Sequence, residues 1–177
     1  QFYTTAHLAY ARGLDGVSFF NFVYYREHGT PLRGPFNEPP FHVIRRVGDS
    51  AWLAKQPQHY FITRAHDNPP VPNRQMGNKK PRIVKAGAVT DFTLDMAPPV
   101  TGWRKGGILR LEANVSVEKN RLAAKLNGLL LDPVQDVCEP YKTPYTQLLG
   151  TTKTLKAWSV PAAVLRDGKN RIELMLE

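Results

Sequence analysis

The spacing of apolar residues changes near residue 58, and this change divides the chain into two predicted parts. Before it, the pattern predicts a helix at 2–12 that ends at Gly13, a strand at 17–23 and helical structure from residue 39 onward. After it, apolar and polar residues alternate with a period of two, which is typical of strands with one buried face. We therefore expect a small helix-strand-helix unit at 1–58 and a β domain at 59–177.

The first part has the pattern of one step of a (β/α)8 barrel. Its predicted strand, Val-Ser-Phe-Phe-Asn-Phe-Val at 17–23, is apolar on both faces and fits a strand that is buried on both sides. An apolar helical stripe and a further short helix follow, with Phe41, Ile44 and Val47 in the stripe and Trp52 and Leu53 in the short helix. A complete barrel needs roughly 200 residues, so the unit is a remnant of one.

The second part consists of short apolar runs separated by turn residues. Strands are expected at 59–63, 82–86, 89–96, 108–115, 121–127, 129–132, 155–160 and 171–176. Asn127-Gly128 predicts a two-residue hairpin in which both residues have positive φ, and Pro133 is expected to break any strand within 133–154. The predicted fold class is mainly β: an antiparallel, jelly-roll-like β-sandwich preceded by the helix-strand-helix remnant.

The composition is that of an ordinary globular protein, and it excludes several classes. No run of roughly 18 apolar residues is present, so no membrane-spanning helix is predicted. The single cysteine, Cys138, excludes an intrachain disulfide and a multi-cysteine zinc site. The five histidines lack the spacing of metal ligands. We therefore predict no metal and no cofactor.

The net charge of +9 raises the question of nucleic-acid binding. The basic residues are scattered, and the one local cluster lies between Arg74 and Lys85 in a loop rich in Pro, Asn and Gly. No aromatic residue interleaves with this cluster, as single-strand binding by base stacking would require. A solvated basic loop is the better interpretation, and no nucleic-acid partner is predicted.

Three segments resemble bacterial glycoside-hydrolase-like proteins in which a (β/α)8 barrel is followed by a β-sandwich. The run AYARGLDGVSFFNFVYYR at 9–26 resembles the last barrel step, in which a helix with a similar ending leads into the eighth strand. The runs LAAKLNGLLL at 122–131 and PAAVLRDGKNRIEL at 161–174 resemble a hairpin and the closing edge of the sandwich. The resemblance implies that this chain is the C-terminal region of a larger glycoside hydrolase.

The same resemblance bears on catalysis. Glycosidic cleavage usually requires two carboxylates that face the scissile bond. In barrels of this kind, the resemblance puts these acids on the fourth and seventh strands, which the chain as given does not contain. Taken alone, the chain is therefore expected to be inactive, to hold no catalytic residue and to support the barrel.

A dense group of polar and aromatic residues follows the predicted strand at 17–23, at the end that faces the active site in a barrel. Tyrosine can stack on a sugar and hydrogen-bond to it, and charged side chains can orient sugar hydroxyls. A tryptophan in the turn before 108–115 is a further candidate for stacking. The candidate substrate-binding residues are Asn21, Tyr24, Tyr25, Arg26, Glu27 and Trp103. The structural alternative is aromatic packing together with a solvated Arg26–Glu27 pair.

Two other functions stay open. A stand-alone carbohydrate-binding module requires exposed aromatic residues in a row or groove. A structural or protein-interaction domain requires a closed sandwich with an apolar docking patch.

The expected partners are carbohydrate and the rest of the barrel domain, or a second copy that pairs through 17–23. The compartment is left open, since such a parent protein can be secreted or periplasmic.

Overall fold

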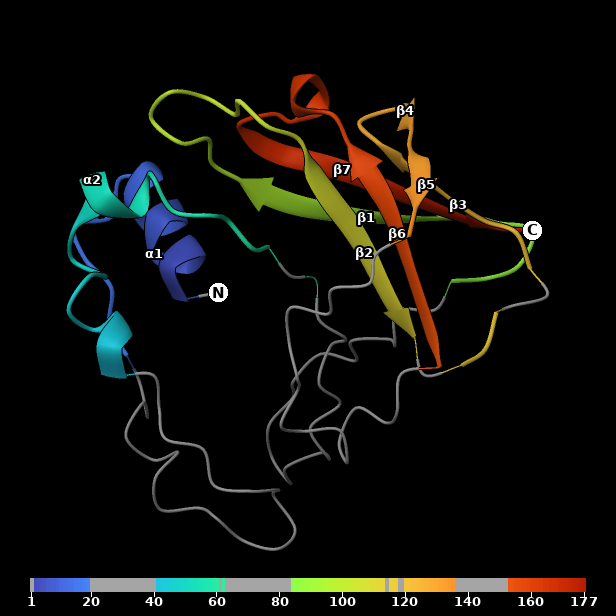
Figure 1. Ribbon diagram of the computed structural model, residues 1–177, viewed down its shortest axis with the longest axis horizontal. Coiled ribbons are helices and arrows are strands. Elements are labelled where there is room, and N and C mark those ends of the chain that lie inside the picture. Colours follow the sequence, from blue (N-terminus) through green and yellow to red (C-terminus); the bar gives the residue numbers. More distant parts are fainter. Residues whose placement is uncertain are drawn as a thin grey trace, which may run out of the picture.

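The computed structural model describes residues 2–19, 41–60, 62, 84–113, 115–117, 120–135 and 153–177. Two parts are visible in Figure 1: a group of short helices and a pair of antiparallel sheets. The helices lie beside one end of β1 (Val89–Met96), and the C-terminus lies on the opposite side of the sheets. The described part of the chain is thus mainly β, as the sequence predicts.

Every strand pair among the described residues is antiparallel. One sheet has the order β1-β7-β3-β4 and the other the order β2-β6-β5. The bounds of the remaining strands are Gly107–Ala113 for β2, Leu122–Leu126 for β3, Leu129–Leu130 for β4, Asp132–Val134 for β5, Thr154–Val160 for β6 and Gly168–Leu176 for β7. Because β4 and β5 belong to different sheets, the chain crosses between the sheets at Leu131.

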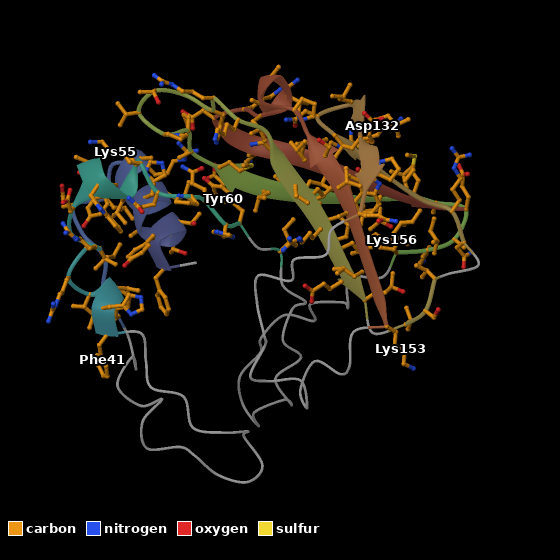
Figure 2. All side chains as sticks on the ribbon, in the orientation of Figure 1. Phe41, Lys55, Tyr60, Asp132, Lys153 and Lys156 are labelled. Carbon is orange, nitrogen blue, oxygen red and sulfur yellow. The ribbon has the colours of Figure 1, made fainter. Side chains whose placement is uncertain are left out.

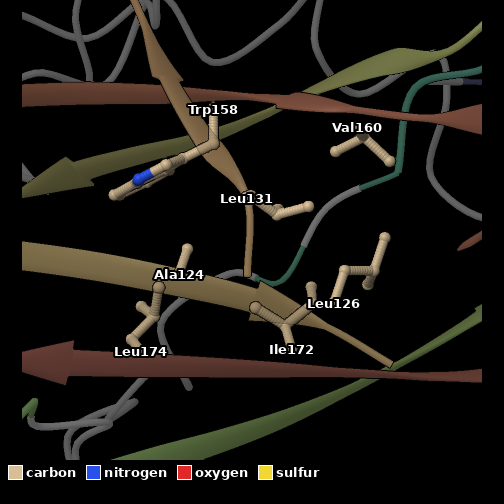
Figure 3. Packing of buried hydrophobic residues seen from close by; sticks show 7 residues of the cluster. All are labelled: Ala124, Leu126, Leu131, Trp158, Val160, Ile172 and Leu174. Carbon is tan, nitrogen blue, oxygen red and sulfur yellow. The ribbon is translucent and has the colours of Figure 1, made fainter. Parts of the chain in front are cut away.

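The main core lies between the two sheets. Figure 3 shows Trp158 and Val160 of β6 facing the side chains that β3 and β7 contribute from the other sheet. Leu131 fills the space where the chain crosses over, and it is 4% exposed. Trp158 is 2% exposed and is the largest fully buried side chain among the described residues. Each sheet therefore buries one face against the other in a β-sandwich-like arrangement.

A second buried cluster holds the helices together. It joins α1 (Phe2–Ala11), the 3-10 turn η2 (Phe41–Val43) and α2 (Ser50–Leu53). Ala6 and Leu53 are its most buried members, and Tyr3 packs edge to face on Trp52 with ring centroids 4.9 Å apart. None of the helices in the part of the chain that the structure describes is long and apolar enough to cross a membrane.

The end of α1 is built around a glycine. Gly13 has a φ of +84°, in the left-handed region that glycine adopts without a steric penalty. Its N–H donates to the Tyr10 carbonyl at 3.0 Å, and the N–H of Leu14 donates to the Ala9 carbonyl at 3.1 Å. This is the Schellman pattern, which satisfies the last carbonyls of a helix. It confirms Gly13 as the stop signal and leaves Arg12 as the capping residue of α1.

The hairpin between β3 and β4 is confirmed. Asn127 has a φ of 51° and Gly128 a φ of 90°, as a type I′ turn requires. The Asn127 side chain also fixes the turn to the rest of the sheet. Its Nδ2 donates to the Val164 carbonyl at 2.8 Å, and its Oδ1 accepts from the Arg171 N–H at 2.9 Å. Asparagine is thus required at this position by both the turn and its neighbours.

Gly128→Val is expected to lower the free energy of unfolding by about 1 kcal/mol or more, because a β-branched residue is strained at positive φ. An added Cβ would meet no atom within 4 Å, so the penalty comes from the backbone conformation. Gly107→Val on β2 is the matched control, since that glycine is equally open and has no positive φ. Urea titration of both variants measures the difference. Equal unfolding midpoints would show that the turn is not strained.

One strand lies where the sequence predicts irregular structure. Pro133 sits inside β5, opposite Trp158 of β6. The prediction that Pro133 breaks any strand is therefore wrong at residues 132–134. β5 is the edge of its sheet, paired with β6 alone, and a proline is tolerated on an edge strand because its missing N–H costs no ladder hydrogen bond on the open side.

Two further strand predictions also fail. At 59–63, the described residues are in no strand, and the His59 N–H donates to the Thr4 hydroxyl at 2.8 Å instead of to a neighbouring strand. At 82–86, the described residues form only an isolated bridge from Ala86 to Leu176. At 59–63, the bond between His59 and Thr4 of α1 takes the place of strand pairing, although the local sequence alternates as in a strand.

The helix-strand-helix unit is also less regular than predicted. The helix expected from residue 39 is present only as the short turn η2, followed by turns up to Gly48. Of the predicted apolar stripe, Val47 is buried, whereas Phe41 and Ile44 are exposed; this is too little burial to support a longer helix. In the strand predicted at 17–23, Val17 and Phe19 adopt no strand and pack against the helical cluster. Residues 20–23 lie outside the described part.

Candidate functional site at the junction of helices and sheets

Of the predicted substrate-binding residues, Asn21, Tyr24, Tyr25, Arg26 and Glu27 lie outside the described residues. Trp103 lies in the loop between β1 and β2, where it is partly buried. Polar side chains of the described residues gather where the helices meet the sheets.

Arg12 joins α1 to the sheets through three partners. Its Nη2 lies 2.8 Å from Asp95 Oδ1 and 2.6 Å from the Met96 carbonyl, at the end of β1. Its Nη1 donates to Asp167 Oδ1 at 2.9 Å, in the turn before β7. One planar guanidinium thus contacts two carboxylates and a carbonyl, a geometry that an ammonium group could not reproduce.

These contacts change the electrostatics of the junction. The hydrogen bonds to Asp95 and Asp167 raise the pKa of Arg12 above its ordinary value. Conversely, the hydrogen bond from Arg12 lowers the pKa of Asp95. A general acid in glycoside hydrolysis needs a raised carboxyl pKa, so Asp95 does not fit that role. Both Asp95 and Asp167 hold the Arg12 guanidinium in place.

Two more side chains, both of α1, contact other segments: His7 the loop just after β1, and Thr4 the segment that follows α2. The Nε2 of His7 donates to the Pro98 carbonyl at 3.0 Å. The hydroxyl of Thr4 accepts the His59 N–H at 2.8 Å. His7 and Thr4 are 6% and 5% exposed, so both bonds are shielded from water. α1 is therefore held at several points along its length and not by Arg12 alone.

A second polar group lies between the helices and β1. The Tyr60 hydroxyl accepts the Ala97 N–H at 3.1 Å and lies 2.9 Å from Gln58 Oε1, to which it can donate. Burial raises the pKa of Tyr60, so it stays protonated at neutral pH. The indole N–H of Trp103 donates to the same Gln58 oxygen at 3.4 Å. Trp103 thus takes part in a packed polar network, which favours the structural alternative for this residue.

Sequence reasoning missed Arg12, Asp95 and Asp167 as a group. Arg12 and Asp167 each precede a glycine with positive φ, and such turns often fix a neighbouring side chain. The pairing itself spans 155 residues between Arg12 and Asp167, so no local pattern could indicate it. No three side chains of His, Cys, Asp or Glu gather into a metal-binding group within the described residues.

A comparison with models of known protein families found no match, and a search among curated proteins likewise found none.

Proposed function

We propose that this chain is the C-terminal accessory region of a glycoside-hydrolase-like protein, non-catalytic by itself. In this proposal, residues 1–58 are the last step of a (β/α)8 barrel, and 59–177 form a jelly-roll-like sandwich that supports it. The observation that best supports the proposal is the position of Arg12. It lies inside the run at 9–26 that resembles the last barrel step, and it joins α1 to β1 and to the turn before β7.

An accessory domain can support a barrel only if it holds a barrel element in a fixed orientation. Two side chains meet this requirement. His7 of α1 bonds to Pro98 just after β1, and Arg12 at the end of α1 bonds to Asp95 and Met96 of β1. These contacts, one within α1 and one at its end, limit how far the helix can move relative to β1. In the proposed parent protein, the sandwich would therefore set the position of the last helix of the barrel.

The second part of the proposal is contact between the parent protein and glycan. It rests on the resemblance for residues 21–27, which would lie at the mouth of the barrel. For Trp103, the bond to Gln58 and its partial burial favour packing over sugar stacking. We therefore assign any glycan contact to the strand end and not to the sandwich.

Sequencing the gene upstream of the Gln1 codon tests the proposal. It predicts seven further βα units, with acidic residues at the ends of the fourth and seventh strands. An upstream region with a different repeat, or none, would refute the barrel interpretation and leave the sandwich as an independent module.

No measurable hydrolysis by this chain is expected across a panel of aryl glycosides and polysaccharides, because the paired carboxylates are missing. The measurement is release of the chromophore or of reducing sugar over a day. Robust turnover that is abolished by Glu27→Gln, and not by Glu112→Gln on the exposed surface of β2, would contradict the prediction.

A further inference from the structure

A groove runs between α2 and the loop that connects β1 to β2. Its volume is about 490 Å3, within the range of roughly 300–1,000 Å3 that is typical of binding pockets. Ala51 and Ala54 line it from the helical side, three residues apart and hence on one helix face. Pro99 and Val100 line it from the loop. The walls are thus small aliphatic side chains from two parts of the chain.

The loop wall of the groove is fixed in place. The Gly102 N–H donates to the Pro99 carbonyl at 2.8 Å, and Gly102 has a φ of +72° that closes this turn. His7 of α1 holds the preceding carbonyl, that of Pro98, at 3.0 Å. A wall that is already ordered loses little conformational entropy when a partner binds. Val100 projects from this wall and is 82% exposed.

Two cations flank the groove, Lys55 after α2 and Arg104 after the loop turn. Both are exposed, and neither forms an ion pair or side-chain hydrogen bond with another described residue. This differs from Arg12, Arg46 and Arg171, whose guanidinium groups all face carboxylates. No acidic residue lines the groove in the described part of the chain.

We propose that this groove binds an acidic segment of a partner protein that carries an aliphatic side chain. The aliphatic walls match an apolar side chain, and the two cations match carboxylates on either side of it. Only one short helix and one loop enclose the groove, which suits an extended peptide better than a small ligand that must be mostly surrounded. The proposal goes beyond an accessory role in a hydrolase and does not depend on it.

Other occupants fit less well. A sugar would need an aromatic face to stack on, and none of the lining residues is aromatic. Single-stranded nucleic acid would need aromatic stacking surfaces, which this groove does not have among its lining residues. A second copy of the chain would carry the same net charge of +9 and repel the first.

Fluorescence anisotropy with a labelled synthetic peptide tests the proposal. The probe has a central leucine with two glutamates on each side. One matched peptide has glutamine in place of every glutamate, and another has serine in place of the leucine. The glutamate-leucine probe should bind best. The double variant Lys55→Glu, Arg104→Glu should weaken binding by about tenfold or more, because two attractive pairs become repulsive. Val100→Ser should weaken it by about threefold through lost apolar contact.

The double variant Lys153→Glu, Lys156→Glu is the control, since it changes the net charge equally. Figure 2 shows Lys156 on β6 and Lys153 at the start of that strand, both away from Lys55. Circular dichroism checks that each variant is folded, and Val100→Ser tests the groove without a charge change. Equal weakening by the two double variants would show binding to net charge alone and overturn the proposal. So would equal affinity for the glutamine or serine peptide, tighter binding of an oligothymidine competitor, or no binding of the probe.

Discussion

Replacing Asn170 with leucine is expected to lower the free energy of unfolding by about 3 kcal/mol or more. Asn170 is 0% exposed and uses both ends of its amide. Its Oδ1 accepts from the Arg166 N–H at 3.0 Å and from Asn127 Nδ2 at 2.8 Å. Its Nδ2 donates to the carbonyls of Arg166 and Gly168, at 2.7 and 3.0 Å. Leucine has a similar size but can neither donate nor accept a hydrogen bond. Each of these partner groups would therefore lose its bond to residue 170.

Asn120→Leu provides the matched control for this change. Asn120 is exposed and forms a single side-chain bond, to the Glu177 carbonyl at 3.3 Å. Its loss should change stability by about 0.5 kcal/mol or less. Chemical denaturation of both variants and the parent chain gives the comparison. If the two variants unfold at the same denaturant concentration, the buried amide does not organise the turn before β7.

Arg12→Ala is expected to loosen the C-terminal end of α1 while the sheets stay folded. The change removes the bonds to Asp95, Asp167 and the Met96 carbonyl at once. Hydrogen exchange of the α1 amides should accelerate several-fold, because local opening no longer breaks these contacts. Arg171→Ala is the control, since its partners Asp91 and Glu173 lie within the same sheet as Arg171. Unchanged exchange in α1 would show that packing alone holds the helix.

Lowering the pH should reproduce part of the effect of Arg12→Ala, because it weakens the contact between Arg12 and Asp95. The hydrogen bond from Arg12 lowers the pKa of Asp95 below the ordinary aspartate value of about 3.9. The contact is therefore fully present above that value and is lost as the pH falls through the lowered pKa. Exchange in α1, corrected for its intrinsic pH dependence, should be constant from about pH 8 to pH 5 and rise below about pH 4. In Arg12→Ala, this rise should be absent.

The features that the sequence predicts correctly depend on residues close together in the chain. Gly13 ends α1 and Asn127-Gly128 forms the hairpin because positive φ is available to few residues, so the sequence itself reports the backbone conformation. The strands β1, β3, β6 and β7 follow from alternation with a period of two over five or more residues. Trp158 lies two residues before Val160 on the same face of β6, and both side chains are buried.

The failed predictions occur where a distant part of the chain decides the outcome. Pro133 forms part of β5 because β5 lies at a sheet edge, a position that depends on which strand pairs with β6. His59 leaves the predicted strand because its N–H bonds to Thr4 of α1. Neither effect is encoded within a window of neighbouring residues.

The candidate site was less predictable than the fold. The five residues at 21–27 were selected for their chemistry and for their place after a strand, and they stay a prediction. The contacts of Arg12 join residues 83 and 155 positions apart. The groove beside Lys55 arises only where α2 meets the loop after β1. Charged surface residues have no periodic pattern that would reveal such partners.

The sequence by itself determined the turns, the helix end and the regular strands, since steric limits on φ and the alternation of apolar residues act over a few neighbouring positions. The tertiary structure decided which edge tolerates Pro133, which carboxylates neutralise Arg12 and which cations beside α2 have no ion-pair partner among the described residues. The physical reason is that hydrogen bonds and ion pairs act over a few ångströms in space, whatever the separation of their residues along the chain.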